Sequence, residues 1–421
     1  MVSIRFTPLI VLLGMLLLLT TLTPAVQAEN ITTAELELFN AVQRNANGSW
    51  RHSGAGAASI RIDQTGNRNV RSQFELSAAI IPSSTGIDSL QTISRAYGKF
   101  RFESYRGVIG KAPFSWGEGL IFNAADEIFG RGTGVNLMQQ EFDDPTAWIT
   151  SFSRYFGPFS FAELLVNPGL MQLDMRATDP ATSAEAASIG DTRAGVRFVG
   201  KPGGIKIEGG YLFDGRDSDG PASGADGTGD SGGTTTGGAS LQAGDYFHRL
   251  YLSLQGNLWL DWHFSASLEL PDPDHIADSV PDALWAGQLY TAGLYSMIPV
   301  GYDDTLSFRV ETRLYPAGTW SQDHSSDYPD YGIYAYNEVS YDFGGGFSLI
   351  GRGLVSPVDL SARLSPGFSW NLFQGFTLLG FASVQTGEAL DIYAWEAKKA
   401  DGTTDSTTSG LAVQVGCSIT Y

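Results

Sequence analysis

The 421-residue sequence has few of the cysteine, histidine and basic residues that disulfide-bonded, metal-binding or nucleic-acid-binding proteins need. It has one cysteine, Cys417, and five histidines. A lone cysteine forms no intramolecular disulfide, and no two histidines stand at metal-ligand spacing. Basic residues are also scarce, since 26 lysines and arginines face 45 aspartates and glutamates, for a net charge of −19. Such a charge argues against nucleic acid as a partner, and no motif implies a cofactor. Stability must therefore come from a large core or a closed sheet.

Long apolar runs are missing beyond the N-terminus. After residue 28 no stretch approaches the roughly 18 apolar residues of a membrane-spanning helix. The one long run extends from Leu9 to Leu22, behind the single charge of Arg5, and small residues follow at Val26–Ala28. This order is typical of a cleaved secretory signal. We therefore assign residues 1–28 to a signal peptide and expect the mature chain to begin near Glu29.

Alternation of apolar and polar residues dominates the rest of the chain. In the last segment, Gly410–Tyr421, every second residue is apolar and those between are small or polar. Successive side chains of a strand point to opposite faces, so one face of such a segment is apolar and the other polar. About ten such residues cross a bilayer as a tilted strand. Similar segments lie at Val70–Ile80, Arg95–Glu103, Leu258–Leu270, Leu306–Leu314 and Ala362–Leu372.

Short turns alternate along the chain with long loops. The predicted turns lie near residues 64–68, 103–106, 155–158, 200–203, 256–257, 299–304, 343–346 and 373–375. The predicted loops cover residues 81–92, 113–146, 167–190, 214–243, 271–282, 316–328 and 387–408. A bacterial outer-membrane barrel has this asymmetry, with tight periplasmic turns and long external loops. The pattern therefore favours a barrel over a secreted sandwich.

The strand count sets the size of the barrel. About 17 segments qualify, and an even number is required because both chain ends of such barrels normally lie in the periplasm. We therefore predict an all-β fold, a single transmembrane antiparallel β-barrel of about 18 strands over residues 54–421. The alternative is 16 strands, should a weakly alternating segment such as Ala147–Phe156 or Pro158–Val166 not be a strand.

The N-terminal segment, residues 29–53, should supply the missing strand. We place that strand within Asn45–Ser53 and expect a short helix at Thr32–Arg44. In an open sheet the uncharged last strand would be an unprotected edge, whereas in a closed barrel the first strand pairs with it. The terminal aromatic residue, Tyr421, resembles the end signature of outer-membrane barrels, which the barrel assembly machinery reads.

Charged residues on the polar faces should line the lumen. An arginine or lysine facing lipid near the midplane would cost about 2–4 kcal/mol, which fixes this assignment for most of them. The predicted pore lining is Arg71, Arg95, Lys99, Arg101, Arg193, Arg197, Arg249, Arg309, Glu311, Arg313 and Arg363. These residues could form cross-strand ion pairs, such as Arg309 and Arg313 with Glu311, or favour anions as basic rings do. Acidic external loops would oppose anions at the mouth, so the sign of selectivity stays open.

The segment GKAPFSWGEGLIFNAADEIFG, residues 110–130, carries a glycine and tryptophan pattern followed by Asn-x-x-Asp. It resembles a motif of porin-like barrels, including members near the alginate-export group. The matching residues are Gly110, Trp116, Gly117, Gly119, Asn123 and Asp126. The resemblance supports a porin-like protein more than any particular substrate.

Two interpretations of this segment stay open. In one, Trp116 belongs to the interfacial aromatic girdle and Asn123 caps a short helix. In the other, the loop folds into the lumen and narrows the pore. The constriction would then include Trp116, Glu118, Asn123, Asp126 and Arg131.

Enzyme motifs lack their structural context. Gly229–Gly233 reads GDSGG and resembles the nucleophile motif of serine proteases. No strand-to-helix turn is expected there and no histidine lies in a partner motif, so we expect a low-complexity external loop and no enzyme. Asp217, Asp219, Asp226 and Asp230 could hold Ca²⁺ loosely, although their spacing fails the EF-hand pattern.

Barrel width leads to the predicted function. Sixteen to eighteen strands leave an aqueous channel, whereas eight would be filled by side chains. The sequence therefore predicts an outer-membrane channel for passive diffusion of small polar or charged solutes. The expected partners are outer-membrane lipid, the solutes, the assembly machinery and other copies of the chain in a homo-oligomer. Alternatives are a surface adhesin or structural barrel whose acidic loops bind a partner, and an exporter of an acidic polysaccharide.

Overall fold

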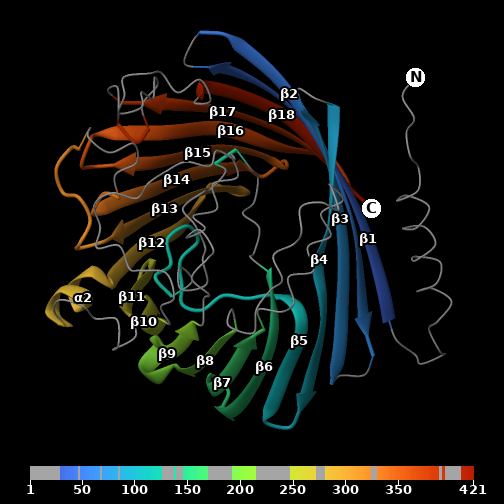
Figure 1. Ribbon diagram of the computed structural model, residues 1–421. Coiled ribbons are helices and arrows are strands. Elements are labelled where there is room, and N and C mark those ends of the chain that lie inside the picture. The colour runs from blue at the N-terminus through green and yellow to red at the C-terminus, as the bar shows by residue number, and fades with distance from the viewer. Residues whose placement is uncertain are drawn as a thin grey trace.

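The computed structural model is a closed antiparallel sheet of 18 strands (Figure 1). It describes residues 29–45, 48–66, 69–83, 86–125, 137–138, 146–168, 192–214, 247–271, 280–323, 330–387, 391–393 and 409–421. Each strand pairs with its neighbours in the sequence, and β1 also pairs with β18, which closes the ring. The predicted barrel of 18 strands is confirmed, and the alternative of 16 is not.

The strands differ in length around the ring. They are β1 (Glu29–Asn45), β2 (Trp50–Thr65), β3 (Val70–Ser83), β4 (Gly86–Phe102), β5 (Tyr105–Pro113), β6 (Thr146–Gly157), β7 (Ser160–Asn167), β8 (Arg193–Gly200), β9 (Lys206–Asp214), β10 (Phe247–Asn257), β11 (Asp261–Pro271), β12 (Gln288–Val300), β13 (Asp304–Leu314), β14 (Ile333–Phe343), β15 (Phe347–Ser356), β16 (Ser361–Phe373), β17 (Phe376–Thr386) and β18 (Ser409–Thr420). A 3₁₀ turn, η4 (Pro202–Gly204), and a helix, α2 (Val280–Ala286), lie between strands. None of the helices in the described part of the chain has the length and apolar character needed to span a membrane.

Short connections join the strands at one end of the barrel, where both Glu29 and Tyr421 also lie. The turns at residues 103–104, 158–159 and 374–375 fall where the sequence predicts them. The turn predicted at 256–257 lies instead at 258–260, because β11 begins at Asp261. The loop predicted at 81–92 is also wrong, since β3 continues to Ser83 and β4 begins at Gly86.

The N-terminal segment is the main correction to the fold. Residues 29–45 form the long strand β1 and not a short helix, and β2 already begins at Trp50. The outward residues Leu36 and Leu38 do alternate, but Phe39 on the inner face is also apolar because it packs against a buried cluster inside the barrel. That inner apolar residue blurred the period of two. The predicted signal peptide, residues 1–28, lies outside the described residues.

The outer face is apolar, as a lipid-facing wall requires. On β18 the side chains of Val413, Val415 and Ile419 are 42%, 50% and 42% exposed, while the intervening Ser418 is buried on the inner face. Large aromatic side chains are exposed near the short turns, as in the girdles of membrane barrels. Among them are Phe102, Phe156, Phe159, Trp259, Tyr302, Phe373 and Tyr421.

This assignment of faces predicts an asymmetric response to an added charge. Val339 is 53% exposed on the outer face, whereas the Oγ of the next residue, Ser340, lies 2.6 Å from the Oγ of Ser307 on the inner face. We expect Val339→Arg to lower the free energy of unfolding in liposomes by about 2–4 kcal/mol, because the charge meets hydrocarbon. Ser340→Arg, whose charge enters the polar lumen, serves as the control in the same urea titration. Equal losses in both variants would contradict the assignment.

Candidate functional site

The connection between β5 and β6 folds into the barrel. After Pro113 the chain leaves the wall, and Figure 1 shows this segment in teal inside the ring of strands. Its described residues, 114–125 and 137–138, contact successive parts of the wall. We call residues 114–125 with 137–138 the inward loop. The described part of the loop therefore lies inside the barrel, and that it narrows the pore stays a prediction.

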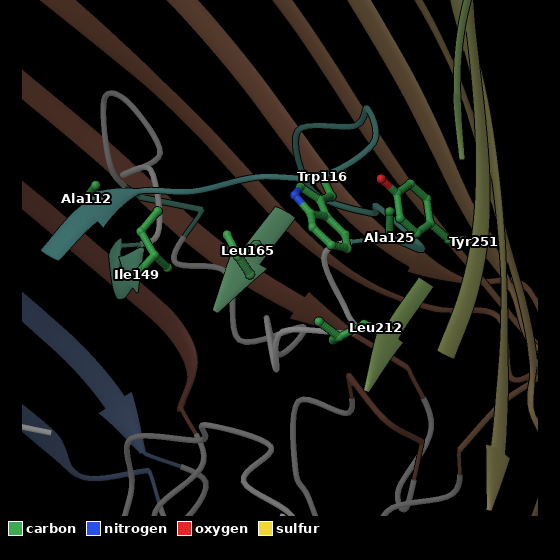
Figure 2. Close-up of a cluster of buried hydrophobic side chains, with 7 residues drawn as sticks. All are labelled: Ala112, Trp116, Ala125, Ile149, Leu165, Leu212 and Tyr251. Atoms are coloured by element: carbon green, nitrogen blue, oxygen red, sulfur yellow. The ribbon is translucent and has the colours of Figure 1, made fainter. Parts of the chain in front are cut away.

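Trp116 fixes the start of the inward loop in a pocket of the wall (Figure 2). Its ring is fully buried, and its centroid lies 5.4 Å from that of Tyr251 on β10 in a stacked arrangement. The other buried residues of this cluster come from β5, β6, β7, β9 and the loop itself: Ala112, Ile149, Leu165, Leu212 and Ala125. Trp116 is therefore an internal anchor, and its assignment to the lipid-facing aromatic girdle is wrong.

Two glycines of the inner wall make room for this pocket. A Cβ added at Gly195 would lie 2.6 Å from Cη2 of Trp116 and 2.9 Å from Cδ1 of Leu212. A Cβ at Gly210 would lie 2.5 Å from Cε1 of Tyr251. All three distances are shorter than side-chain contacts allow, so the absence of a Cβ at these two positions of β8 and β9 makes room for the two rings.

Glu208 is the centre of a buried polar network next to Trp116. It is 1% exposed, and its Oε1 accepts hydrogen bonds from Gly117 N (2.9 Å), Tyr251 Oη (2.9 Å) and Arg197 Nη1 (3.0 Å). The Nζ of Lys206 lies 3.2 Å from its other oxygen, Oε2. A buried carboxylate needs such charged and hydrogen-bonded partners. One carboxylate thus joins the loop backbone to three strands.

Lys206 and Arg197 extend this network to further acids and to the inward loop. Lys206 Nζ lies 2.5 Å from Glu118 Oε1, and Arg197 Nε lies 2.5 Å from Glu163 Oε2. Arg197 Nη1 also donates to the carbonyl oxygen of Ser115 at 3.3 Å. The predicted pore residue Arg197 and the predicted constriction residue Glu118 therefore belong to one connected network.

Glu311 on β13 holds the middle of the inward loop. Its Oε1 accepts a hydrogen bond from Leu120 N (2.9 Å), and its Oε2 accepts from Ile121 N (2.8 Å) and Phe122 N (3.0 Å). The predicted ion pairs of Glu311 with Arg309 and Arg313 are absent from the ion pairs of the described residues. The reason is that the loop backbone occupies both carboxylate oxygens.

The end of the described loop packs into two further clusters. Phe122 and Leu137 are buried with Tyr331, Tyr334, Tyr336 and Leu354, where Arg352 Nη1 donates to the carbonyl oxygen of Leu137 at 3.2 Å. The partly buried Tyr393, from the β17–β18 connection, packs against this cluster, and burial raises the pKa of its phenol to about 12. Met138 is buried with Leu379, Phe381 and Ala412 of β17 and β18. The inward loop thus spans the barrel from β5 to β18.

Asn123 stabilises the loop from within. Its Nδ2 donates to the carbonyl oxygen of Trp116 at 2.8 Å, and its Oδ1 accepts from Ala125 N at 3.1 Å. Gly117 and Gly119 have positive φ angles of 77° and 133°, which favour glycine there. The other two predicted constriction residues, Asp126 and Arg131, lie outside the described residues. A helix capped by Asn123 would begin at Ala124, but Ala124 and Ala125 form a turn, and residues 126–136 lie outside the described part of the chain.

Cross-strand ion pairs neutralise several predicted lumen charges. Glu75 on β3 lies 2.7 Å from Arg61 and 3.6 Å from Arg95. Arg249, which is 4% exposed, lies 2.8 Å from Glu269. Three other arginines contact polar groups of the wall or the loops: Arg313 reaches Asp330 (3.4 Å), Arg352 reaches Glu338 (2.7 Å), and Arg363 reaches Ser383 Oγ (3.3 Å). The ion-pair interpretation of these residues is therefore correct for part of the set.

A second group of lumen cations has no carboxylate within ion-pair distance among the described residues. Arg71 and Lys99 are directly opposite in the β3–β4 register, and Arg101 follows two residues along β4. Lys99 Nζ lies 4.8 Å from the ring centroid of Tyr97. On β13, Arg309 lies 4.9 Å from the ring centroid of Tyr295. Arg193 does not belong to this group, because it lies at the start of β8 opposite Asp214 in the β8–β9 register.

A recess of about 280 Å³ lies between the inward loop and the wall of β10–β13. It is lined by Glu118, Gly119, Leu120, Gln255, Asp261, Trp262, His263, Leu294, Tyr295, Arg309 and Glu311. Within the described part of the chain, no three His, Cys, Asp or Glu side chains are grouped so that they could hold a metal ion. The candidate Ca²⁺ aspartates and the GDSGG segment lie in residues 215–246, outside that part.

The buried network of Glu208 should contribute more to stability than the solvent-exposed ion pair between Arg313 and Asp330. We expect Glu208→Ala to lower the free energy of unfolding by about 3–5 kcal/mol, because it removes a fully buried carboxylate partner from the partly buried Arg197 and Lys206. Asp330→Ala removes a partner that is 59% exposed. That change should cost about 0–1 kcal/mol. Urea titrations of both variants in detergent micelles measure the difference, and a loss for Glu208→Ala no larger than for Asp330→Ala would refute the role of this network.

Sequence reasoning missed the acids that hold the inward loop. Glu208 and Glu163 were not among the predicted site residues, and Glu311 was assigned to ion pairs. One signal was available: Glu208, Gly210 and Leu212 share the inner face of β9, and a glycine on that face marks a close approach of another group. His263 on β11 lies beside Glu311 in the recess.

Comparison with known proteins identifies the fold. No protein-family model matches the chain, and neither does any curated protein sequence. Solved structures do match: OccAB3 of Acinetobacter baumannii has a TM-score of 0.53 and 9% identity, with 93% of this chain and 99% of that chain covered. OccK2 (OpdF) of Pseudomonas aeruginosa, solved with glucuronate, has a TM-score of 0.52 and 10% identity, with 93% and 98% covered.

A third match is OccAB1 of Acinetobacter baumannii, with a TM-score of 0.51, 11% identity, and coverage of 94% of this chain and 98% of that chain. These neighbours are outer-membrane porins. The likeness shows that this chain has the fold of such porins. It does not support the narrower resemblance of residues 110–130 to the alginate-export group.

Proposed function

We propose that this chain is an outer-membrane porin, a water-filled barrel through which small polar or charged solutes diffuse passively. The observation that carries the proposal is the closed barrel of 18 strands with an apolar outer face, ion pairs on its inner face, and a loop fixed inside it. Barrels of this strand number leave an aqueous channel. The inward loop then sets the narrowest part of the passage.

The lumen charges support small organic anions as the preferred solutes. Arg71, Lys99 and Arg101 lie close together on β3 and β4 without a carboxylate partner among the described residues. Uncompensated basic residues along a pore attract anions. The structural neighbour OccK2 is solved with glucuronate, a sugar acid. We therefore propose that anions pass more readily than cations of the same size.

Planar-bilayer recording of the purified full-length protein tests the proposal. We expect discrete conductance steps in symmetric KCl, and in a KCl gradient a reversal potential on the anion-selective side. A barrel that inserts into liposomes but never conducts would refute the pore and favour a surface protein whose loops bind a partner. A cation-selective reversal potential would refute the anion preference alone.

Biogenesis and assembly belong to the same proposal. The last strand, β18, ends beside a 97% exposed Tyr421, whose backbone exchanges hydrogen bonds with Ala34 of β1 at 2.8 and 2.9 Å. This placement suits recognition of the terminal strand by the barrel assembly machinery.

We also propose that the porin is not an enzyme and that copies assemble into a homo-oligomer in the membrane. Cross-linking in membranes tests the oligomer, and impaired insertion of a chain lacking Tyr421 tests the recognition.

A further inference from the structure

We propose that Glu311 is a positioning residue that latches the inward loop to the barrel wall and keeps the constriction at a fixed width. The inference deepens the proposed pore function and rests on it for its effect on conduction. Its structural part, that Glu311 immobilises residues 120–122, stands on the contacts alone.

Three consecutive backbone N–H groups converge on this one carboxylate. Leu120 N, Ile121 N and Phe122 N lie 2.9, 2.8 and 3.0 Å from its two oxygens. Hydrogen bonds to an ionised acceptor are about twice as strong as those between neutral groups. Glu311 is 1% exposed, so water does not compete for its oxygens. The backbone of β13 is held by β12 and β14 on both sides, which makes Glu311 a rigid point of attachment.

The latch is specific because no arginine of the described part of the chain forms an ion pair with the Glu311 carboxylate. Its neighbours along the inner face of β13 have other contacts: Arg309 lies 4.9 Å from the centroid of the Tyr295 ring, and Arg313 reaches Asp330 at 3.4 Å. Within the described residues, the hydrogen-bond donors to Glu311 all belong to the inward loop. A buried carboxylate that loses its partners is costly, so the loop and Glu311 stabilise each other.

The other contacts do not replace this one. The Trp116 pocket fixes the loop before residue 120, and the cluster around Phe122 and Leu137 holds its apolar side chains. Between them the backbone of residues 120–122 has polar groups that face the wall, and Glu311 is what satisfies them. Without this acceptor, the three N–H groups gain more from water than from the wall.

Hydrogen–deuterium exchange of the protein in liposomes tests the latch without reference to conduction. In Glu311→Gln the side-chain NH₂ faces backbone donors, so at least one hydrogen bond is lost. We expect the amides of Leu120, Ile121 and Phe122 to exchange about tenfold faster or more, because each bond to a charged acceptor is worth at least that factor. Unchanged exchange at these three residues in a folded variant would overturn the proposal.

Two further variants complete the test, one as a control for a general loosening of the barrel and one as a second way to disturb the latch. Glu75→Gln removes an equally inward, 8% exposed carboxylate whose partners, Arg61 and Arg95, belong to the wall. It should leave exchange at residues 120–122 unchanged. Gly293→Ala keeps the carboxylate but adds a Cβ that would lie 2.2 Å from His263 Cε1 and 3.0 Å from Glu311 Cγ. By displacing these groups it should accelerate exchange at residues 120–122, and no effect there would contradict the geometry of the latch.

Single-channel recording then tests the consequence for the pore. We expect a steady current from the wild-type protein and from Glu75→Gln, and frequent transitions to higher levels from Glu311→Gln as the loop leaves the wall. Steady wild-type current from Glu311→Gln, despite faster exchange, would overturn the fixed-width claim. If the wild-type protein does not conduct at all, the pore function fails and so does the fixed-width claim, whereas faster exchange in Glu311→Gln would still support the latch.

Discussion

Replacing residues 114–145 with a tight hairpin turn is expected to raise the single-channel conductance severalfold while the barrel still closes. The two ends can be joined directly because Pro113 of β5 and Thr146 of β6 are paired residues in the register of these strands. The replacement removes the inward loop, which crosses from the Trp116 pocket to the Met138 cluster. Since the narrowest section dominates the resistance of a pore, its removal should have the largest effect on current.

The energetic cost of this replacement is predictable from the anchors. Glu208 keeps Arg197, Lys206 and Tyr251 on the wall, whereas Glu311 loses its three loop donors. We therefore expect the loopless barrel to be less stable. Because Glu311 then faces the water-filled lumen, Glu311→Gln in that background should change the free energy of unfolding far less than it does in the full-length protein. Urea titration of the two pairs of proteins measures this difference.

A matched control shortens another long connection. Residues 215–246 lie between Asp214 of β9 and Phe247 of β10, which also pair directly, so the same tight turn can replace them. This variant tests whether any loss of a long connection increases the current. The expected order of conductance is the β5–β6 replacement far above the β9–β10 replacement, with the latter near the wild-type protein. A β5–β6 replacement with wild-type conductance would show that the inward loop does not limit the pore.

The sequence predicted the wall of the barrel better than its inside. Lipid requires apolar side chains on the outer face of every strand. Segments such as residues 411–421 could therefore be predicted as strands from their alternation of apolar and polar residues. The rule fails where the inner face is apolar as well. Phe39 on β1 faces the cluster around Met138 and Phe381, and without knowledge of that contact residues 32–44 read as a helix.

The inside of the barrel depends on contacts between distant residues, which local patterns do not encode. Glu311 is about 190 residues away in the sequence from its partners in the loop, and Glu208 is 91 residues away from Gly117. From composition alone, an inward glutamate between two arginines suggests an ion pair. The structure gives it backbone donors instead, because the loop arrives at that place in the wall. The segment that enters the lumen was predictable from its length and its motif, while the side chains that receive it were not.

Arg309 has no ion pair with Glu311 because the backbone of the inward loop occupies that carboxylate. If Glu311 had paired with Arg309, the lumen would carry one fewer uncompensated cation near the inward loop. Because the loop occupies Glu311, Arg309 lies over Tyr295 and lines the recess with Glu118 and Asp261. The recess is therefore mixed in charge, whereas the basic group on β3 and β4 has no described acid beside Lys99. For this reason we propose that the residues of β3 and β4 determine the charge selectivity of the pore.

Charge reversal on β3 and β4 is accordingly expected to invert the selectivity of the channel. Arg71, Lys99 and Arg101 lie on the inner face within a few residues of the short-turn end, and no described carboxylate pairs with them. Their fields reach about 8 Å into the lumen at physiological salt. Replacing all three with glutamate should change the sign of the reversal potential in a KCl gradient, and Lys99→Glu alone should move it toward zero.

The control for this effect is the same substitution outside the lumen. Lys201 is exposed in the short connection between β8 and β9, where its Nζ lies 5.7 Å from the ring centroid of Phe159. Lys201→Glu changes the net charge of the protein as much as Lys99→Glu does, so any difference between the two reversal potentials reflects position and not total charge. A triple variant that folds, conducts and retains the wild-type reversal potential would show that ions pass these strands beyond the reach of their charges. Selectivity would then have to arise at the inward loop, where Lys206 is paired with Glu118 and Arg309 has no ion-pair partner among the described residues.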